Sequence, residues 1–384
     1  METPPGTSVA RVELIDFRCY ESIHLDLPSG VTVISGDNGE GKTSILEAVV
    51  WCALGRSFRG VPDAALVRAG QEEAVVRTFI SSPERNRKIE VGLRRTGRNK
   101  ILLDGKAVIR LRDLIGALRV TVFAPDDLAL IKGGPAGRRT FIDELLTTIN
   151  PRFSGVRADY EKVLRHRNAL LRAGGRANSR SDEGATLEVF NQQLVATGSE
   201  LLEGRLQLLN QIFPEVQLAY RELAIEPVAL EADYVCDWAT LGPNETGLSQ
   251  TLTREELAKT MRAALSALAG RERERGTTLV GPHRDEWALT LAGLESRSQA
   301  SQGEQRTLAL ALRLAGHRAV TAAFGQEPVL VLDDVFSELD EYRSAALVER
   351  LAAPQTLIST AGPLPFGVEV AARVCVANAT ARVQ

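Results

Sequence analysis

The spacing of apolar residues predicts strands in the first hundred residues of the chain. Apolar and polar positions alternate at 11–14 and at 24–27, and a continuous apolar run follows at 31–34. Alternation with a period of two places neighbouring side chains on opposite faces of a sheet. Three turn signals separate further short strands: Pro83, Thr96-Gly97 and Asp104-Gly105.

The period becomes helical from about residue 136. One helix face collects apolar side chains and the other is rich in arginine; the apolar positions are Val156, Tyr160, Val163, Leu164 and Leu171. A polar, Gly-rich break follows at 173–184. Leucines then recur every seven residues, at Leu187, Leu194, Leu201 and Leu208. This repeat fits the seam of a short antiparallel helix pair or coiled coil, and it fits an ordinary core stripe equally well.

The last third of the chain alternates between helix and strand. Short apolar runs at 328–332 and 355–358 are separated by helical sequence. Runs of this length between helices indicate a parallel sheet that is buried on both faces. The chain is therefore predicted to be an α/β protein.

Composition excludes several classes of protein. The chain has 384 residues and 44% hydrophobic content, which is enough for one large domain or two moderate ones. Four scattered cysteines without a C-x-x-C pair argue against a disulfide framework and against a structural zinc site. No apolar stretch reaches the roughly 18 residues of a membrane span, and the first residues lack the apolar core of a signal peptide. We therefore expect a cytoplasmic protein without a membrane partner.

The formal net charge of −3 hides a strong separation of charge. Residues 85–100 hold seven Lys or Arg against one acid, and residues 132–180 hold eleven against four. The two windows carry +6 and +7, which leaves −16 for the rest of the chain. Such segregation indicates a cationic surface for a polyanion such as DNA, although charged runs can also be simple solvated faces.

A glycine-rich segment after the apolar run at 31–34 matches the phosphate-binding pattern G-x-x-x-x-G-K-[ST]. Its residues are Gly36, Asp37, Asn38, Gly39, Glu40, Gly41, Lys42 and Thr43, and a helix opens at Ser44. Glycines let consecutive backbone N–H groups curl around an anion, and the helix N-terminus adds partial positive charge. Lys42 is predicted to reach the β- and γ-phosphates of ATP, and the Thr43 hydroxyl to ligate Mg²⁺.

Two acids follow the apolar strand at 328–332 directly. Ligands bind at the carboxyl ends of strands in open α/β sheets, so Asp333 is predicted to be the second Mg²⁺ ligand. Asp334 is placed to orient or deprotonate the attacking water. The alternative is that the two acids only cap the following turn.

The segment Ser301-Gln302-Gly303-Glu304 precedes an apolar run at 308–314 and has the S-x-x-E spacing of a helix capping box. Its unpaired N–H groups also suit an anion. Here the sequence resembles the ABC-type ATPases of the SMC and Rad50 class, whose signature is S-x-G-[EQ]. In that class the signature of one subunit covers the γ-phosphate on another, so the resemblance implies that Ser301, Gly303 and Glu304 bind nucleotide in an ATP-dependent homodimer.

Other motifs of this class are matched in part. Asp16-Phe17-Arg18 resembles the segment whose arginine contacts nucleotide, and residues 337–340 resemble the D-loop that crosses the dimer interface. Asp334 stands where many relatives have a catalytic Glu, which implies slow hydrolysis. Ser359-Thr360 stand where transporters place a His, so the γ-phosphate sensor is unassigned, as is the Q-loop glutamine.

Within this class the sequence resembles the RecF family over nearly its whole length. The resemblance is carried by 125–134 with its continuation to 143, by 281–285, and by 332–340. The short helical insert also fits this family better than the long coiled coils of SMC proteins and Rad50. Arg138 and Arg139 could have a functional role or could simply be the solvated start of a helix. His283 could have a functional role or could be a buried histidine held by hydrogen bonds.

The resemblance implies an ABC-type P-loop ATPase head, a mixed sheet wrapped on helices, with a mostly helical second lobe. Residues 1–119 and 318–384 would form the two parts of the ATPase lobe, and residues 120–317 the helical lobe.

The same resemblance implies a slow, DNA-stimulated ATPase of replication and recombinational repair. ATP would drive dimerisation on double-stranded DNA near gap boundaries, and hydrolysis would release it; RecO and RecR are the implied partners in recombinase loading. One alternative is an ABC transporter ATPase subunit, which the departure of 300–304 from L-S-G-G-Q and the presence of Thr360 disfavour. Another is a non-hydrolysing ATP-dependent structural clamp, which Asp334 motivates.

Overall fold

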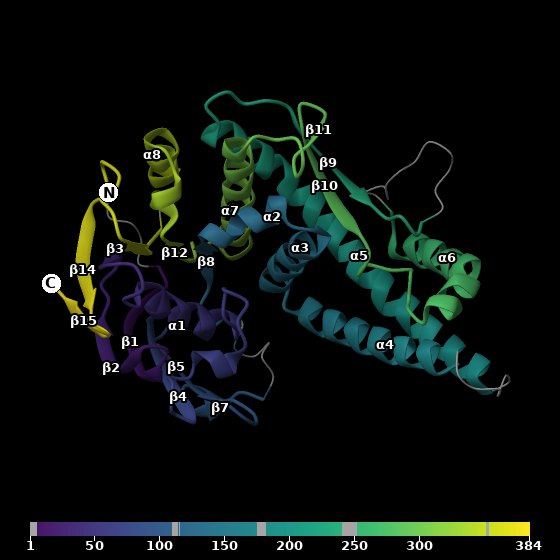
Figure 1. The fold of residues 1–384 in the computed structure, drawn as a ribbon, viewed down its shortest axis with the longest axis horizontal. Coiled ribbons are helices and arrows are strands. Elements are labelled where there is room, and N and C mark those ends of the chain that lie inside the picture. The colour runs from purple at the N-terminus through teal and green to yellow at the C-terminus, as the bar shows by residue number, and fades with distance from the viewer. Residues whose placement is uncertain (1–5, 110–113, 115, 175–181, 240–251, 351–352) are drawn as a thin grey trace. The chain divides into compact units, whose positions relative to one another are not determined.

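The computed structural model describes residues 6–109, 114, 116–174, 182–239, 252–350 and 353–384. The chain divides into two compact units (Figure 1). Unit 1 consists of Met1–Asp127, Ala219–Glu226 and Ala309–Gln384, and unit 2 of Leu128–Leu218 and Pro227–Leu308. These divisions lie eight or nine residues from the boundaries suggested by the sequence, which were 119/120 and 317/318. Two helices, α5 (Asp182–Leu223) and α7 (Gln302–Phe324), have residues in both units.

The first sheet of unit 1 is antiparallel, with strand order β2-β1-β4-β5-β6-β7. Its strands are β1 (Ser8–Phe17), β2 (Tyr20–Asp26), β4 (Glu73–Ser81), β5 (Arg87–Arg94), β6 (Lys100–Leu103) and β7 (Lys106–Ala107). In β4, buried side chains alternate with more exposed ones, as a half-buried sheet requires. Asp104 and Gly105 both have positive φ and make the turn between β6 and β7. The strands predicted at 11–14 and 24–27 are confirmed.

The second sheet of unit 1 has strand order β15-β14-β3-β13-β12-β8 and is parallel except for β15. Its strands are β3 (Gly30–Ser35), β8 (Val120–Phe123), β12 (Val329–Asp333), β13 (Gln355–Thr360), β14 (Val370–Ala377) and β15 (Thr380–Val383). Every residue of β12 and β13 is buried. The prediction of a parallel sheet covered on both faces is confirmed. The short helix α8 (Glu341–Arg350) connects β12 to β13.

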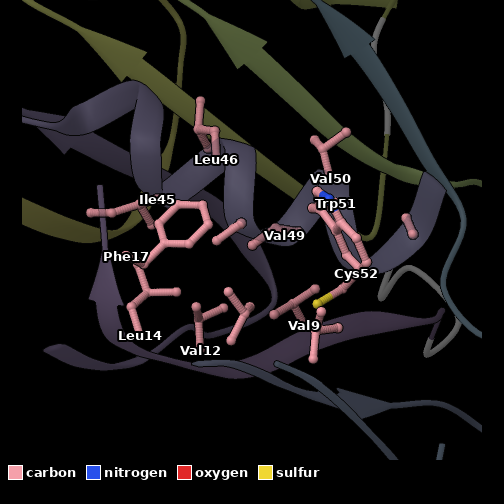
Figure 2. Packing of buried hydrophobic residues seen from close by; sticks show 14 of the residues in the cluster. Val9, Val12, Leu14, Phe17, Ile45, Leu46, Val49, Val50, Trp51 and Cys52 are labelled. Atoms are coloured by element: carbon pink, nitrogen blue, oxygen red, sulfur yellow. The ribbon is translucent and has the colours of Figure 1, made fainter. Parts of the chain in front are cut away.

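Helix α1 (Lys42–Leu54) packs against both sheets, touching β1 and β4 of the first and β12 and β13 of the second. Eleven of its 13 residues are buried. A helix that is apolar on all sides is stable only when it is covered on all sides, so α1 lies in the middle of the core. Figure 2 shows Ile45 of α1 packed close to Phe17 of β1, with Trp51 at the other end of the cluster, nearer to Val9.

Unit 2 is mostly helical. Its elements are α2 (Ala129–Lys132), α3 (Pro135–Ile149), α4 (Arg152–Gly174), most of α5, α6 (Arg254–Arg275) and a three-stranded sheet of β9 (Leu230–Val235), β10 (Glu286–Leu291) and β11 (Leu294–Glu295). Together with the sheets of unit 1, this arrangement confirms the predicted α/β fold class. No helix of the described residues is both long and apolar enough to span a membrane.

The heptad leucines belong to the core of unit 2. Leu194, Leu201 and Leu208 are buried along α5. At Gly198 the helix comes so close to α6 that a Cβ atom there would lie 2.7 Å from Met261 Cε. The core-stripe interpretation therefore holds. Part of the predicted break at 173–184 lies outside the described residues, since α4 ends at Gly174 and α5 begins at Asp182.

A buried glutamine joins the two sheets of unit 1. Gln355, at the start of β13, is fully buried, and its Nε2 donates to the carbonyl oxygens of Val9 (2.8 Å) and Pro28 (3.0 Å). Its Oε1 accepts from the Val9 N–H at 2.7 Å. The register of β1 shifts between Val9 and Arg11, so the side chain supplies hydrogen bonds that the irregular strand leaves open.

Replacing Gln355 by Leu should therefore destabilise unit 1. The change removes the side-chain partners of two buried backbone groups, the Val9 N–H and carbonyl oxygen, and of the Pro28 carbonyl oxygen, so we expect the free energy of unfolding to fall by about 2–4 kcal/mol. Denaturant unfolding would measure this against Gln207→Leu, an exposed position on α5. Equal midpoints for the two variants would contradict the role given to Gln355.

Candidate nucleotide-binding site

Parallel pairing brings the predicted phosphate-binding residues together in unit 1. In the register of the second sheet, Asp333 lies opposite Ser359, and Ser359 lies opposite Ile34. The carboxyl ends of β3, β12 and β13 therefore share one edge of the sheet, and the P-loop of residues 36–43 begins at that edge. Ligands bind at such edges in α/β proteins.

Two glycines of the P-loop occupy positions that no other residue could fill. Gly41 has φ 110°, and a Cβ there would lie 2.6 Å from Cys19 Sγ. Gly36 has φ 156°, and a Cβ there would lie 2.2 Å from the carbonyl oxygen of Val376. The loop therefore has no side chain at these two positions, which lets its backbone N–H groups approach an anion.

The N-terminus of α1 has no capping side chain and no acid in its first turn. Its first N–H groups and its dipole are therefore available to a phosphate. Lys42 is buried, and its Nζ donates to the carbonyl oxygens of Gly36 (2.7 Å) and Asp37 (2.8 Å). The Lys42 ammonium group thus lies against the loop whose bound phosphates it is predicted to contact. Ser44 follows in the first turn and is buried.

Thr43 and Asp333 are in direct contact although 290 positions separate them. The Thr43 hydroxyl donates to Asp333 Oδ1 at 2.8 Å, and the Ser359 hydroxyl donates to the same oxygen at 2.6 Å. Burial raises the pKa of Asp333, whereas these two hydrogen bonds lower it. A hydroxyl and a carboxylate are hard oxygen donors, the type that Mg²⁺ prefers, so the pair fits the predicted metal site.

Asp334 has one buried carboxylate oxygen, Oδ1, without a hydrogen-bond partner among the described residues. Its backbone is left-handed, with φ 50°, and its N–H donates to the Ser359 hydroxyl at 3.0 Å. Its side chain makes no capping hydrogen bond to the following 3-10 turn. The capping alternative is therefore wrong for Asp334, and the free oxygen remains available for a polar ligand such as water.

Ser359 is a site residue that sequence reasoning noticed only as a departure from transporters. Its hydroxyl holds Asp333 and at the same time accepts from the Asp334 backbone, so it orients both acids. Thr360 bonds instead within its own turn, to Gly362. Position on the strand next to β12 was the signal that could have identified Ser359.

Arg18 and Glu40 have partners in the protein. Arg18 makes a two-pronged ion pair with Glu47 of α1, at 2.8 and 2.9 Å, and Glu47 is fully buried. Glu40 accepts a hydrogen bond from the backbone N–H of Asn378. Contact of Arg18 with nucleotide stays a prediction. The remaining P-loop positions, Asp37, Asn38 and Gly39, are exposed.

The signature residues lie in unit 2, at the start of α7. The Glu304 N–H donates to Ser301 Oγ at 3.3 Å, and Glu304 Oε2 accepts from the Ser301 N–H at 2.8 Å. The predicted capping box is therefore confirmed. Ser301 is exposed, and its side chain hydrogen-bonds to the Glu304 carboxylate, which lowers the pKa of Glu304. Gly303 is half-buried beside it. Nucleotide binding by these residues stays a prediction.

Two of the family-like residues are structural. Arg138 is buried, with a bidentate ion pair to Glu286 at 2.7 and 2.8 Å, so the solvated-helix alternative is wrong for it. His283 contacts the Tyr160 hydroxyl through Nδ1 at 2.6 Å and the Thr278 carbonyl oxygen through Nε2 at 3.2 Å. It is the hydrogen-bonded histidine of the second alternative.

Carboxylates neutralise part of both basic windows. In residues 85–100, Lys88 lies 3.0 Å from Glu90, and Arg85 lies 3.4 Å from Asp104. In residues 132–180, four arginines form ion pairs: Arg138 with Glu286, Arg152 with Glu200, Arg157 with Glu161 and Arg167 with Glu272. Counting charge along the sequence therefore overstates the charge that a polyanion can reach.

Residues 8–360 match the family described as the RecF/RecN/SMC N terminal domain. Proteins described as "DNA replication and repair protein RecF" from Streptomyces avermitilis and Kineococcus radiotolerans are each 42% identical to the chain, over 358 and 364 residues. Each comparison covers 92% of this chain and 93% of the relative.

Two solved structures of a recombination mediator protein RecF in the RecFOR pathway, one with ATP and one with ATPrS, are similar to the whole chain. Both have a TM-score of 0.88, with 28% and 27% sequence identity. They cover 100% and 99% of this chain and 99% and 98% of the solved chains. An Smc head domain from Pyrococcus furiosus shares the fold, with a TM-score of 0.55 and 15% identity over 98% of this chain and 96% of that chain.

Replacing Ser359 by Ala should weaken metal-dependent nucleotide binding. The change removes a hydrogen bond that lowers the pKa of Asp333, so the carboxylate takes up a proton at a higher pH and Mg²⁺ affinity is lost earlier on acidification. Loss of such an orienting group costs about tenfold or more in metal affinity. Titration of a fluorescent ATP analogue with and without Mg²⁺ would measure this.

The matched control is Thr360→Val, whose hydroxyl bonds only within its turn. An equal loss of nucleotide affinity for Ser359→Ala with and without Mg²⁺ would contradict the role given to Ser359.

Proposed function

The chain belongs to the RecF family of DNA replication and repair proteins, and we propose that ATP switches it between a free protomer and a homodimer on DNA. The observation that carries this proposal is the Thr43–Asp333 contact beside an uncapped helix N-terminus, in a chain that also carries an exposed Ser-x-Gly entrance at Ser301. The Thr43–Asp333 contact and the uncapped helix have the form of one half of a nucleotide site, and the segment at Ser301 has the form of the other half.

The P-loop half binds the phosphates of ATP. Backbone N–H groups of residues 36–43 and Lys42 contact them, while Thr43 and Asp333 hold Mg²⁺. Mg²⁺, when bound, neutralises negative charge on the phosphates. The whole-chain similarity to structures of RecF with ATP and ATPrS supports this assignment.

Asp334 positions the water that attacks the γ-phosphate. Its unpartnered Oδ1 is the acceptor, and its backbone is fixed by Ser359. Because an aspartate stem is one methylene shorter than the glutamate of many relatives, hydrolysis is slow. DNA stimulates it when the dimer closes.

A second copy of the chain supplies the opposite half of each nucleotide site. Ser301, Gly303 and the N-terminus of α7 in one protomer cover the γ-phosphate held by the other. The exposure of Ser301 and the partial positive charge of the helix end support this arrangement. ATP then joins two protomers, and hydrolysis separates them.

The dimer acts in the cytoplasm on double-stranded DNA near gap boundaries, within the response to DNA damage. RecO and RecR are its partners in loading recombinase onto single-stranded DNA. The two solved relatives are RecF proteins of the RecFOR pathway, which supports these partners. Membership in the RecF family argues against a transporter subunit.

A non-hydrolysing clamp remains a second candidate, because Asp334 replaces the usual glutamate. In that case ATP binding alone would close the dimer, and exchange of nucleotide would open it.

The dimer proposal predicts that two substitutions both prevent dimerisation but differ in their effect on nucleotide binding. Lys42→Met should abolish nucleotide binding and dimerisation together, because it removes the phosphate-binding ammonium. Ser301→Arg should keep nucleotide binding but block the dimer, because the larger side chain would occupy the space where Ser301 meets the γ-phosphate held by the partner. Sedimentation with unhydrolysable ATP and equilibrium nucleotide titration measure both properties. An intact Ser301→Arg dimer would sink the proposal.

The hydrolysis proposal predicts that Asp334→Asn lowers phosphate release by about 100-fold or more, which is the usual contribution of a positioned base. ATP-dependent dimerisation should persist, since the carboxylate is not needed for binding. Asp233→Asn, at an exposed position of β9, is the control. Unchanged release in Asp334→Asn would contradict the role given to Asp334, and no release from the native protein with DNA would favour the clamp.

A further inference from the structure

A cavity in unit 2 gathers arginines from three separate segments of the chain. Its volume is about 400 Å³, and its wall includes Arg139 of α3, Arg271 and Arg275 of α6, and Arg284 from the turn before β10. Asp237 is the one carboxylate among the described lining residues. Four guanidinium groups against one carboxylate leave an excess of three positive charges around the cavity.

The histidine in the wall is neutral and fixed. His283 donates from Nε2 to the Thr278 carbonyl oxygen, so its Nδ1 accepts the Tyr160 hydroxyl proton. Burial, with the charges of Arg284 and Arg139, lowers the pKa of His283 to about 4. The ring therefore forms a rigid side of the cavity without changing its charge near pH 7.

The acids around this part of unit 2 are already occupied. Each is held by another group: Asp143 by Arg205, Glu272 by Arg167, Glu286 by Arg138, and Asp285 by Tyr234 and Trp238. None of the four lining arginines forms an ion pair with an acid among the described residues. The internal network therefore leaves Asp237 as the one carboxylate among the described residues that line the cavity.

The lining arginines place like charges close together, and three of them, Arg271, Arg275 and Arg284, are exposed to solvent that screens their repulsion. Arg271 and Arg275 are four residues apart on one face of α6, where like charges repel. Arg139 is half-buried, and burial and the charge of Arg205 lower its pKa; its hydrogen-bond partner among the described residues is the Asp285 carbonyl oxygen, at 2.7 Å. The dipole at the C-terminus of α6 favours Arg275 but does not explain why Arg139 and Arg284 converge on the same cavity.

We propose that this cavity is a phosphate-binding site, and that the phosphates it takes belong to a nucleic acid strand. Planar guanidinium groups bind phosphate oxygens in pairs, and several of them around one cavity suit either a terminal phosphate, which is doubly charged, or two neighbouring phosphodiesters better than a single carboxylate. A cavity of this size admits a phosphate with part of its sugar. The assignment to nucleic acid rests on the proposed function, whereas the phosphate site itself rests on the cavity alone.

The test compares Arg271→Gln/Arg275→Gln with Lys259→Gln/Arg273→Gln in the full chain. Both double variants remove two positive charges from exposed positions of α6, but only the first pair lines the cavity. DNA affinity is measured at several salt concentrations with a short duplex that carries or lacks a 5′-phosphate. For the cavity variant we expect the slope of log K against log salt to fall by about two, one for each lost phosphate contact. The control should keep a slope closer to that of the native protein.

A second measurement separates free phosphate from DNA. Pyrophosphate is titrated calorimetrically into Lys42→Met protein, in which the P-loop is disabled, with and without the cavity substitutions. If pyrophosphate binds and the cavity substitutions abolish this binding, the phosphate site is supported. If the native protein nevertheless binds no DNA, the proposed function is refuted and the phosphate site is not. Pyrophosphate binding with an unchanged DNA slope overturns the nucleic acid assignment. The proposal is overturned if pyrophosphate does not bind. It is also overturned if, in a competition measurement, an acidic peptide displaces DNA from the protein more strongly than pyrophosphate does.

Discussion

The candidate nucleotide site depends on the parallel register of β3, β13 and β12. That register sets Asp333 beside Ser359 and both of them beside the end of β3, where the P-loop starts. Side chains alternate between the two faces of a strand, so a slip of one residue would exchange Asp333 for Asp334 at Thr43. The buried apolar residues of β12 and β13, packed on both faces, make such a slip unfavourable because it would move charged groups into the core.

In the proposed site, the glycines, lysine and threonine of the P-loop would supply generic phosphate contacts, while the two aspartates and Ser359 would decide what happens to the bound phosphate. Asp333 is tied to two hydroxyls, but Asp334 retains one free buried oxygen. One serine therefore separates the roles of two adjacent carboxylates, since it donates to the first and accepts from the backbone of the second.

In unit 2, buried ion pairs have a different consequence. The pairs Arg138–Glu286, Arg167–Glu272 and Arg205–Asp143 fix the arrangement of helices around β10. Such pairs cost desolvation and contribute more to a unique arrangement than to stability. Because these pairs occupy Asp143, Glu272 and Glu286, Asp237 is the one carboxylate among the described residues that line the cavity. The charge distribution that fixes the helices therefore also leaves the excess of positive charge on which the proposed phosphate site rests.

The sequence by itself determined the strands at 11–14 and 24–27, the phosphate loop at Gly36 to Thr43, the capping box at Ser301 and the parallel character of the last sheet. Each of these rests on local rules of backbone geometry or periodicity, which operate within a few residues. Tertiary structure alone decided the partner of Arg18, the neutralisation of the basic windows, the core position of the heptad leucines and the role of Ser359. Those features depend on which distant segments meet, and an ion pair or hydrogen bond formed across strands leaves no trace in the local pattern of residues.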